Sequence, residues 1–426
     1  MNRSRGNWSA PLLYMFTNLA AKSLAALSQL YAVFVFSSMY SPAEASIVFV
    51  LLGYAIWIQI LEFGLAQTLQ NKLNRRKISL SESYFVIFAH YVGMLLFAIL
   101  LVSIPEFCMP FLPKEQYSAE RWAVQAFSVG MALMVIATNN VIIQRVLIVA
   151  NLGLKANILL CAQAVLTMAS LALYQRFGRA DLLISVIAYL SPAVLVYVPI
   201  VIQLIKKLAR RLRSVRIKGL SLYSDAAGFW GLNVLSSIFL GADYYFVAHS
   251  LSSDEIVSYH FATRFFFFSY VAYFSYVQHR AKNLTFITLL QQPEQVRKII
   301  VSTIVIGLVS VGIVSAAILI FDCVDGFSFI MERRLVVPSL IFAATLYFSL
   351  RVIRDTGLVV LWNLGAKPLL YKVYLLEVLL GLSLLWWFSD AYAGVGIFLA
   401  MALTVFASTL IIFYSISRML KYQPTV

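Results

Sequence analysis

The sequence predicts an all-α integral membrane protein with about twelve transmembrane helices. Hydrophobic residues make up 62% of the 426 residues and charged residues only 12%, and the mean hydropathy is +0.86. Soluble domains carry about a quarter charged residues, because a water-facing surface needs them. Long apolar runs recur along the whole chain. At ~35 residues for a span and its connection, this length accommodates about twelve spans and no sizeable soluble domain.

The spans are predicted from apolar runs longer than ~18 residues, separated by charged segments or by segments with Pro or Gly. The first six are Pro11–Ser37, Ser46–Leu69, Glu82–Ser103, Ala123–Ile148, Ala156–Tyr174 and Leu182–Ile205. The second six are Ala226–Ser250, Ile256–Val277, Ile299–Ile320, Val336–Leu358, Leu369–Phe388 and Val395–Ser417. The first run is too long for the apolar region of a signal peptide, so we expect an uncleaved first span.

The distribution of Lys and Arg predicts the orientation in the membrane. The connections on one side of these spans hold 21 of these residues, and those on the other side hold six. Basic residues accumulate in cytoplasmic loops. We therefore expect both termini to face the cytoplasm of a multi-pass protein in the bacterial inner membrane.

The largest basic block divides the chain into two halves. Lys206 to Lys218 contains seven basic residues and lies between six spans and six spans. We predict an N-terminal lobe (1–205), a basic cytoplasmic linker (206–222) and a C-terminal lobe (223–426). An even number of spans in each half allows a parallel repeat. The turns Ser41 to Glu44 and Ser252 to Glu255 repeat a Ser followed three residues later by Glu, which is a capping-box pattern at a helix start.

Several function classes lack the residues they need. The sequence has no GxxxxGK[ST] stretch for nucleotide binding and no GxSxG nucleophile turn. Its four histidines and three cysteines show no metal-ligand spacing, so we expect neither a metal nor another cofactor. The net charge of +15 is assigned to basic loops beside an anionic leaflet rather than to nucleic-acid binding. Transport is the expected function, and the chain is not expected to be an enzyme.

Six cations fall inside the predicted spans, where a charge costs ~2.5–3.5 kcal/mol on insertion scales and usually lines a cavity. Arg145 and Lys372 lie near cytoplasmic ends and can extend to the interface. Lys22 and Arg264 lie near the middle of their spans. Asn18, Lys22 and Gln29 recur at helical spacing and share one face of the first span. Tyr270, Tyr273 and Tyr276 of the eighth span either stack on a sugar or form an interfacial aromatic belt.

The tenth span contains a pair of opposite charges and a further cation. Arg351 and Asp355 stand at i and i+4, so they are expected to neutralise each other and leave Arg354 as the free cation. The acidic residues within spans are Glu62, Asp243, Asp355 and Glu377. Each either forms a structural ion pair or titrates as proton coupling requires. Cations contributed by several helices fit an anionic cargo such as phosphate or pyrophosphate.

Two motifs resemble a known family. Glu62-Phe63-Gly64-Leu65, followed by Gln70-Asn71-Lys72-Leu73, resembles the Asp-Phe-Gly-Leu…Asn signature of polysaccharide flippases. Gly241-Ala242-Asp243-Tyr244-Tyr245, with Tyr259 and Arg264 after an acidic turn, resembles a second pattern of the family. The chain thus resembles the O-antigen (Wzx-type) flippases of the multidrug/oligosaccharidyl-lipid/polysaccharide exporter superfamily. Span count, orientation and the central basic linker extend this resemblance over essentially the whole chain.

The resemblance implies two six-helix lobes that form a V around a central cationic cavity. The implied function is translocation of undecaprenyl-pyrophosphate-linked oligosaccharide, an O-antigen-like repeat unit, from the cytoplasmic to the periplasmic leaflet by ion-coupled alternating access. The pathway's polymerase and chain-length regulator are possible partners besides the membrane lipids. The residues expected to bind this cargo are Lys22, Arg264, Arg351, Arg354, Asn18 and Gln29. Lys22 stands where the related peptidoglycan-precursor flippases have Arg, and Glu62 stands where the signature has Asp.

Two rival functions are considered. A cation-coupled multidrug or small-molecule exporter of the same superfamily would be expected to carry an acidic residue deep in the first span, where this chain has Lys22. A membrane glycan polymerase or transferase would need a large external loop, and the longest external break, Ile104 to Trp122, is short.

Overall fold

The computed structural model describes residues 9–75, 77–114, 121–178, 181–209, 219–289, 292–324 and 336–421. Throughout these ranges the regular structure is helical and no strand occurs, which confirms the predicted all-α class. The first half contains α1 (Ser9–Met39), α2 (Pro42–Gly53), α3 (Ala55–Ile58), the 3₁₀ helix η1 (Gln59–Glu62), α4 (Leu65–Asn74), α5 (Leu80–Ser103), η2 (Pro105–Phe111), α6 (Arg121–Ala137), α7 (Asn139–Val149), α8 (Gly153–Phe177), α9 (Leu182–Leu195) and α10 (Val198–Ala209). The second half contains α11 (Gly219–Ser250), α12 (Ser253–Leu289), α13 (Pro293–Cys323), α15 (Pro338–Asn363) and α16 (Lys367–Lys421).

These helices make twelve passes. Within the described ranges, eight segments are both long and apolar enough to cross a membrane, and the last of them, Lys367–Leu420, contains two passes. The two meet at Ala393, whose φ of 49° and ψ of −136° are not helical. The remaining three passes are α11, α12 and α15, which are 26 to 37 residues long but more polar. A span of ~20 residues suffices to cross the hydrocarbon core, so all three reach across it.

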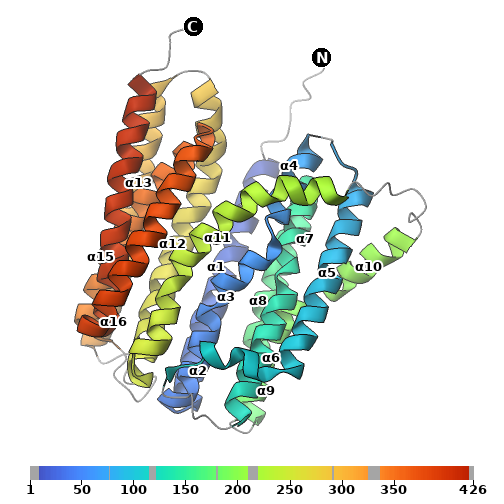
Figure 1. Cartoon of the computed structure of the whole chain (residues 1–426), viewed down its shortest axis with the longest axis vertical. Helices are drawn as coiled ribbons and strands as arrows, with labels where there is room; N and C mark the ends of the chain where they lie inside the picture. The colour runs from blue at the N-terminus through green and yellow to red at the C-terminus, as the bar shows by residue number, and fades with distance from the viewer. Residues whose placement is uncertain are drawn as a thin grey trace.

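The helices form two groups that lean apart (Figure 1). Helices α1 to α10 lie on one side, α12 to α16 lie on the other, and α11 slants between them. The start of α1 and the end of α16 lie at the same end of the bundle, which we call the terminal end; the opposite end is the distal end. The predicted lobe boundaries at 205 and 223 remain predictions. Within the predicted linker, Lys206 and Lys207 belong to α10, whereas residues 210–218 lie outside the described residues.

The second pass is broken, whereas the sequence predicted one span over Ser46–Leu69. After η1 the backbone is left-handed at Phe63 (φ 53°) and Gly64 (φ 69°). Helical hydrogen bonding therefore stops there and restarts in α4. The break packs on the first half of α11, where the Trp230 indole donates to the Ile60 carbonyl at 3.1 Å. Such an interruption is tolerated at membrane depth because neighbouring protein groups satisfy the freed backbone.

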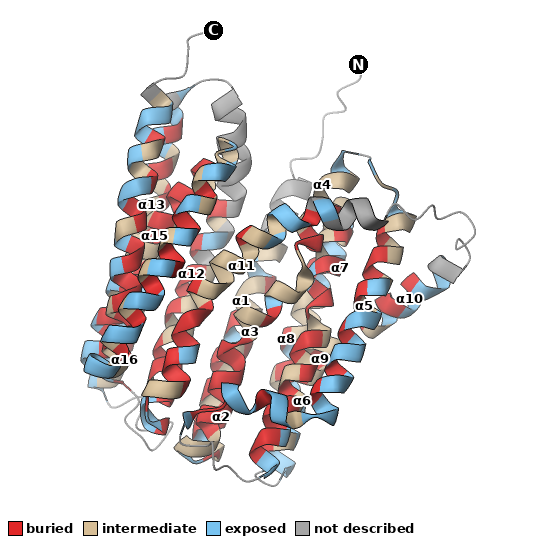
Figure 2. Cartoon of the chain, in the orientation of Figure 1, coloured by how far each residue is buried: buried red, intermediate tan, exposed pale blue. Residues whose placement is uncertain are grey.

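Packing divides the bundle into an inner core and a lipid-facing surface (Figure 2). Only 22% of the most apolar stretch of α13 is buried, against 67% for α6–α7. Apolar residues that stay exposed, such as Leu96 and Ile313, therefore face the hydrocarbon of the membrane. The largest core cluster includes Phe49 of α2, Phe261 of α12 and Phe398 of α16, so it joins both groups of helices.

Both predicted capping turns are confirmed, and both lie at the distal end. Ser41 and Glu44 form a complete capping box at the start of α2. Glu255 accepts hydrogen bonds from the backbone N–H and the hydroxyl of Ser252 at 2.9 and 2.8 Å, at the start of α12. Each box satisfies helix N-terminal donors and so sets where the next helix begins.

Candidate functional site

A cavity of about 630 Å³ lies between the two groups of helices, and its α15 lining comes from the second half of that helix, Arg351 to Trp362. Helices α1 and α8 form one wall, and α11, α12, α15 and α16 form the other. Three cations and one carboxylate line it, together with aromatic residues of α12, α15 and α16. The charged lining residues are Lys22, Arg351, Arg354 and Asp355.

Helix α1 contributes two of the predicted residues to the wall. Lys22 and Gln29 both line the cavity, as expected for side chains two turns apart on one helix face. The Lys22 ammonium lies 5.8 Å from the centroid of the Phe274 ring across the cavity, within the range of a cation–π contact. Asn18 is half-buried and lies one turn nearer the terminal end, outside the cavity wall.

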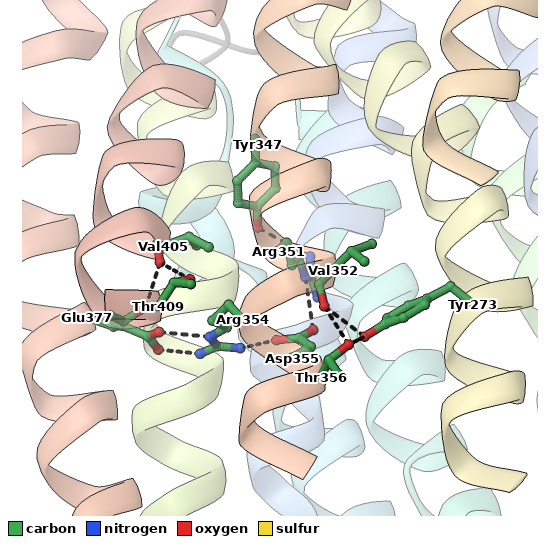
Figure 3. Close-up of polar contacts among 11 residues, drawn as sticks. Tyr273, Tyr347, Arg351, Val352, Arg354, Asp355, Thr356, Glu377, Val405 and Thr409 are labelled. Atoms are coloured by element: carbon green, nitrogen blue, oxygen red, sulfur yellow. Dashed lines mark hydrogen bonds and ion pairs between the residues drawn. The ribbon is translucent and has the colours of Figure 1, made fainter. Parts of the chain in front are cut away.

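Helices α15 and α16 hold a network of four charged residues (Figure 3). The Arg354 guanidinium forms a two-pronged pair with Glu377, in which Nε lies 2.8 Å from Oε1 and Nη2 contacts Oε2. Its Nη1 lies 2.5 Å from Asp355, and Arg351 Nε lies 3.6 Å from the same carboxylate. The prediction that Arg354 is the free cation of this helix is wrong. Glu377, on a neighbouring helix, supplies a carboxylate that matches the guanidinium fork.

Arg351 is the α15 arginine with the weaker ion pair, because its Nε lies 3.6 Å from Asp355. Its guanidinium stacks 4.6 Å from the centroid of the Tyr270 ring, and Nη1 donates to the Tyr347 hydroxyl at 3.2 Å. Its Nε has no hydrogen-bond partner within the described part of the chain. Tyr270 also lines the cavity, whereas Tyr273 is buried and bonded to Thr356 at 2.6 Å. Arg351 and Tyr270 therefore present a cation and an aromatic face to one cavity wall.

Arg264 lies beyond the cavity and connects the two groups of helices. It donates to Gln29 Oε1 on α1 at 2.9 Å, to the Leu52 carbonyl on α2 at 3.1 Å and to His260 Nε2 at 3.1 Å. All three of its donor nitrogens thus have protein acceptors in this conformation. Its predicted contact with cargo requires these bonds to open.

The remaining acids occupy two separate places. Glu62 stands at the break in the second pass and accepts a hydrogen bond from the Asn233 amide of α11 at 3.3 Å. Asp243 is buried on α11, where Tyr259 donates to its Oδ2 at 2.9 Å. Together with Asp355 and Glu377, the four predicted acids therefore lie at three sites rather than in one cluster. No group of three or more His, Cys, Asp or Glu side chains able to hold a metal occurs among the described residues.

Sequence reasoning missed the closure at the distal end. There the His260 ring stacks on Phe49 of α2 at 4.5 Å, and its Nδ1 pairs with the Tyr244 hydroxyl at 2.8 Å. A Cβ added at Gly53 would lie 1.9 Å from the Tyr244 ring. Glycine at this position allows α2 and α11 to approach closely, as small residues do in membrane helix pairs. In the sequence, Gly53 and the aromatic residues of the second motif were the features that could have indicated this contact.

A second contact of the closure repeats the same arrangement. The Trp57 indole donates to the Gly241 carbonyl at 2.8 Å, and a Cβ at Gly241 would lie 2.5 Å from the indole nitrogen. We call the contacts of Phe49, Gly53 and Trp57 with Gly241, Tyr244 and His260 the distal closure.

Comparison with solved structures identifies the architecture. An inward-facing multidrug resistance transporter of the MATE family, in the MOP superfamily, aligns with a TM-score of 0.72 at 13% identity, covering 96% of this chain and all of the other. Lipid II flippase MurJ in an inward closed conformation aligns at 0.69 and 14% identity, covering 95% of this chain and 87% of MurJ. This chain has the MOP transporter fold.

Solved structures of both inward-facing and outward-facing transporters share this fold. An outward-facing MATE transporter of this superfamily aligns at a TM-score of 0.63 with 13% identity, covering 99% of this chain and all of the other, below the value for the inward-facing one.

Sequence comparison gives a more specific likeness. The chain is 23% identical over 379 residues to a Salmonella typhi protein named "Putative O-antigen transporter", covering 85% of this chain and 87% of that protein. No family model matches. All of these relatives are transporters or flippases rather than enzymes, as expected for this chain.

Proposed function

We propose that this protein is a flippase for undecaprenyl-pyrophosphate-linked oligosaccharide, an O-antigen-like repeat unit. It moves this cargo from the cytoplasmic to the periplasmic leaflet of the bacterial inner membrane. The terminal end is cytoplasmic in this proposal, in accordance with the distribution of Lys and Arg along the sequence. The observation that carries the proposal is the cavity, which is lined by cations from both halves of the chain.

The charges of the cavity favour an anion. Lys22 of α1 lies on one side, and Arg351 and Arg354 of α15 lie on the other. Only Asp355 offsets them among the lining residues, and Glu377 lies behind it at 0% exposure. A lysine ammonium and a guanidinium group are both suited to phosphate oxygens. The aromatic residues beside them provide flat apolar faces on which sugar rings can stack.

The energy source is proposed to be an ion gradient, because the sequence contains no nucleotide-binding loop. Transport in proteoliposomes is expected to stop when all ion gradients are collapsed. Undiminished flipping under that condition would contradict the coupling. The lipid-linked cargo agrees with the names of the O-antigen transporter and of the lipid II flippase to which the chain is similar.

Lys22 provides the central test. We expect Lys22→Ala to weaken cargo binding by about 10- to 150-fold, because a charge-assisted hydrogen bond contributes ~1.5–3 kcal/mol. Flipping is measured in proteoliposomes containing the lipid-linked oligosaccharide, through the accessibility of the glycan to an impermeant lectin. Lys372→Ala is the matched control, since Lys372 is an exposed lysine within a pass. Equal flipping by both variants would remove Lys22 from the mechanism.

Arg264→Ala is expected to abolish surface-glycan display in cells while the protein remains inserted and abundant. The reason is the loss of a cation that joins α12 to α1 and α2 at the far end of the cavity. Display at the wild-type level would exclude a role for Arg264 in transport, and loss of insertion would indicate a structural role.

A multidrug exporter is the second candidate, because the fold matches a MATE transporter at a TM-score of 0.72. The sign of the cavity charge separates the two candidates. Cations lining the cavity repel the cationic drugs that such exporters would have to admit. The test is competition for a cationic dye that binds saturably in the cavity. If farnesyl pyrophosphate displaces the dye no better than a neutral detergent does, the result would favour the exporter.

A further inference from the structure

Asp243 differs from the other three acids within the membrane. Asp355 and Glu377 are paired with the arginines of α15, and Glu62 accepts a hydrogen bond from an amide. Within the described part of the chain, no cation lies within 4.0 Å of the Asp243 carboxyl group. Among the four acids, Asp243 is therefore the one that has neither an ion pair nor a side-chain amide donor within the described residues.

The carboxyl group of Asp243 is buried with one oxygen unsatisfied. The residue is 5% exposed, and Tyr259 donates to Oδ2 at 2.9 Å. The backbone N–H of Tyr244 also donates toward the carboxyl group, but Oδ1 has no hydrogen-bond partner of good geometry among the described residues. Burying an ionised carboxylate that is half satisfied costs several kcal/mol, whereas a protonated carboxyl avoids most of that cost. The geometry therefore suits a carboxyl group that binds a proton while it is enclosed.

The position of Asp243 links the cavity to the distal closure. Ser236 and Leu240 line the cavity from α11, and Asp243 follows within one further turn on the same side of the helix. Its neighbour Tyr244 packs on Gly53 in the distal closure. A group at this boundary is enclosed while the distal closure is intact, and it becomes accessible from the distal side when α2 and α11 separate.

Among the residues that the structure describes, no second acid interacts with Asp243. Tyr259 and Arg264 of α12 and Arg351 of α15 interact with the Asp243 carboxyl group. Tyr347 of α15 interacts with Tyr259 instead. His260 of α12 is occupied by Tyr244 and Arg264. Helix α16 contributes the apolar ring of Phe398, which stacks on Tyr259 at 4.6 Å. Helix α2 contributes Phe49 and Gly53, which do not titrate.

We propose that Asp243 is the proton carrier of the transport cycle. A proton from water on the distal side forms the O–H bond of the Asp243 carboxyl group as the distal closure forms. That bond breaks in the inward-facing state, and the proton passes to water in the cavity. The ionised carboxylate left behind destabilises the closure and favours opening toward the distal side. One proton is imported for each lipid-linked anion exported, and this inference rests on the proposed function for the identity of the cargo.

The opening of the distal end can be measured without cargo. Spin labels on cysteines at Ser38 of α1 and Asp254 of α12 report the distance between the two groups of helices, since both positions are exposed at the distal end. The full-length protein, with its three native cysteines replaced, is placed in proteoliposomes at a series of pH values. We expect the ratio of open to closed molecules to rise with pH, approaching about tenfold per pH unit for a single proton.

Asp243→Asn imitates the protonated group and is expected to remain closed at every pH. Glu106→Gln, which changes an exposed acid of η2, is expected to follow the parent protein. Asp243→Glu restores a carboxyl group and is expected to restore the pH response. A normal pH response in Asp243→Asn overturns the proposal, and so does a parent protein without a response. Loss of the response in both Asp243 variants, with folding intact by size exclusion, also overturns it, because packing rather than titration would then be responsible.

This experiment separates the inference from the proposed function. Binding of farnesyl pyrophosphate to the purified protein tests the anionic cargo, and the distance measurement tests the proton carrier. Absence of farnesyl pyrophosphate binding together with a pH response that depends on Asp243 would reject the cargo and retain the carrier. Binding without that pH response would do the reverse.

Discussion

Gly53 offers the most direct test of the distal closure. In Gly53→Ala, the new Cβ would lie 1.9 Å from the Tyr244 ring, whereas ordinary contact begins at 3.4 Å, so the two groups must separate by about 1.5 Å. The ring cannot turn aside freely, because its hydroxyl is bonded to His260 at 2.8 Å. Overpacking of this kind costs ~1–3 kcal/mol. The closed population should therefore fall by about 5- to 150-fold relative to the open one.

The assay is the distance between spin labels at Ser38 and Asp254 on the two sides of the distal end. Gly312→Ala is the matched control, because no atom outside its own helix lies within 4 Å of a Cβ at that position. Adding Tyr244→Ala to Gly53→Ala removes the obstructing ring and should restore the closed distance. A closed distance that is unchanged in the single variant would refute the role assigned to this contact, and so would a double variant that stays open.

The other predictions concern stability and the break in the second pass. Glu377→Gln leaves the buried Arg354 with Asp355 as its carboxylate partner and should lower the free energy of unfolding by up to ~3–5 kcal/mol, as measured by denaturation in mixed detergent micelles. Replacing Glu377 and Arg354 together by Met should recover most of that loss. The control Glu294→Gln, at an exposed acid, should change the free energy of unfolding by less than ~0.5 kcal/mol. Equal stability of all three variants would show that the Arg354–Glu377 pair does not stabilise the protein. Gly64→Ala places a Cβ 2.8 Å from backbone atoms of α11 at a φ of 69°, so it should destabilise the protein by more than the ~1–2 kcal/mol of the left-handed conformation alone. Gly93→Ala, in open space within α5, should be neutral or stabilising, and an equal response at the two glycines would contradict the packing described for the break.

Lys22 and the α15 network illustrate how one cavity combines two uses of charge. Arg354 is enclosed by Glu377 and Asp355, so much of its charge is compensated within the protein. Lys22 and Arg351 have aromatic neighbours at 5.8 and 4.6 Å. Both line the cavity, so they remain within reach of an entering anion. Arg354 stabilises the wall, whereas Lys22 and Arg351, which shares Asp355 with Arg354, bind the cargo in the proposed function.

The second motif of the sequence gains a physical explanation from the closure. Gly241 and Tyr244 contact α2 and α3 of the first half, and Tyr259 holds the carboxyl group of Asp243. Arg264 completes the set by bonding to α1 and α2. These residues all lie at the boundary between the cavity and the distal end. The motif is therefore explained by contacts within the protein rather than by binding of a common ligand.

The sequence by itself determined the properties that depend on local free energies. Transfer of each apolar run into lipid is favourable by itself, so span count and approximate limits could be read from composition. The capping boxes at Ser41 and Ser252 depend on four consecutive residues, and the face shared by Lys22 and Gln29 depends on one helix. None of these requires knowledge of a neighbouring helix.

Only the tertiary structure decided which side chains meet. Arg354 pairs not only with Asp355, its neighbour in sequence, but also with Glu377 on another helix, which the sequence did not indicate. Arg264 reaches Gln29 across 235 positions of the chain, and the helix break at Gly64 depends on backbone atoms of α11. Helices of similar hydropathy enter lipid equally well, so hydropathy alone does not determine which helix packs against which. Close packing and the hydrogen bonds between particular helices make that choice, and they exist only when the helices are assembled.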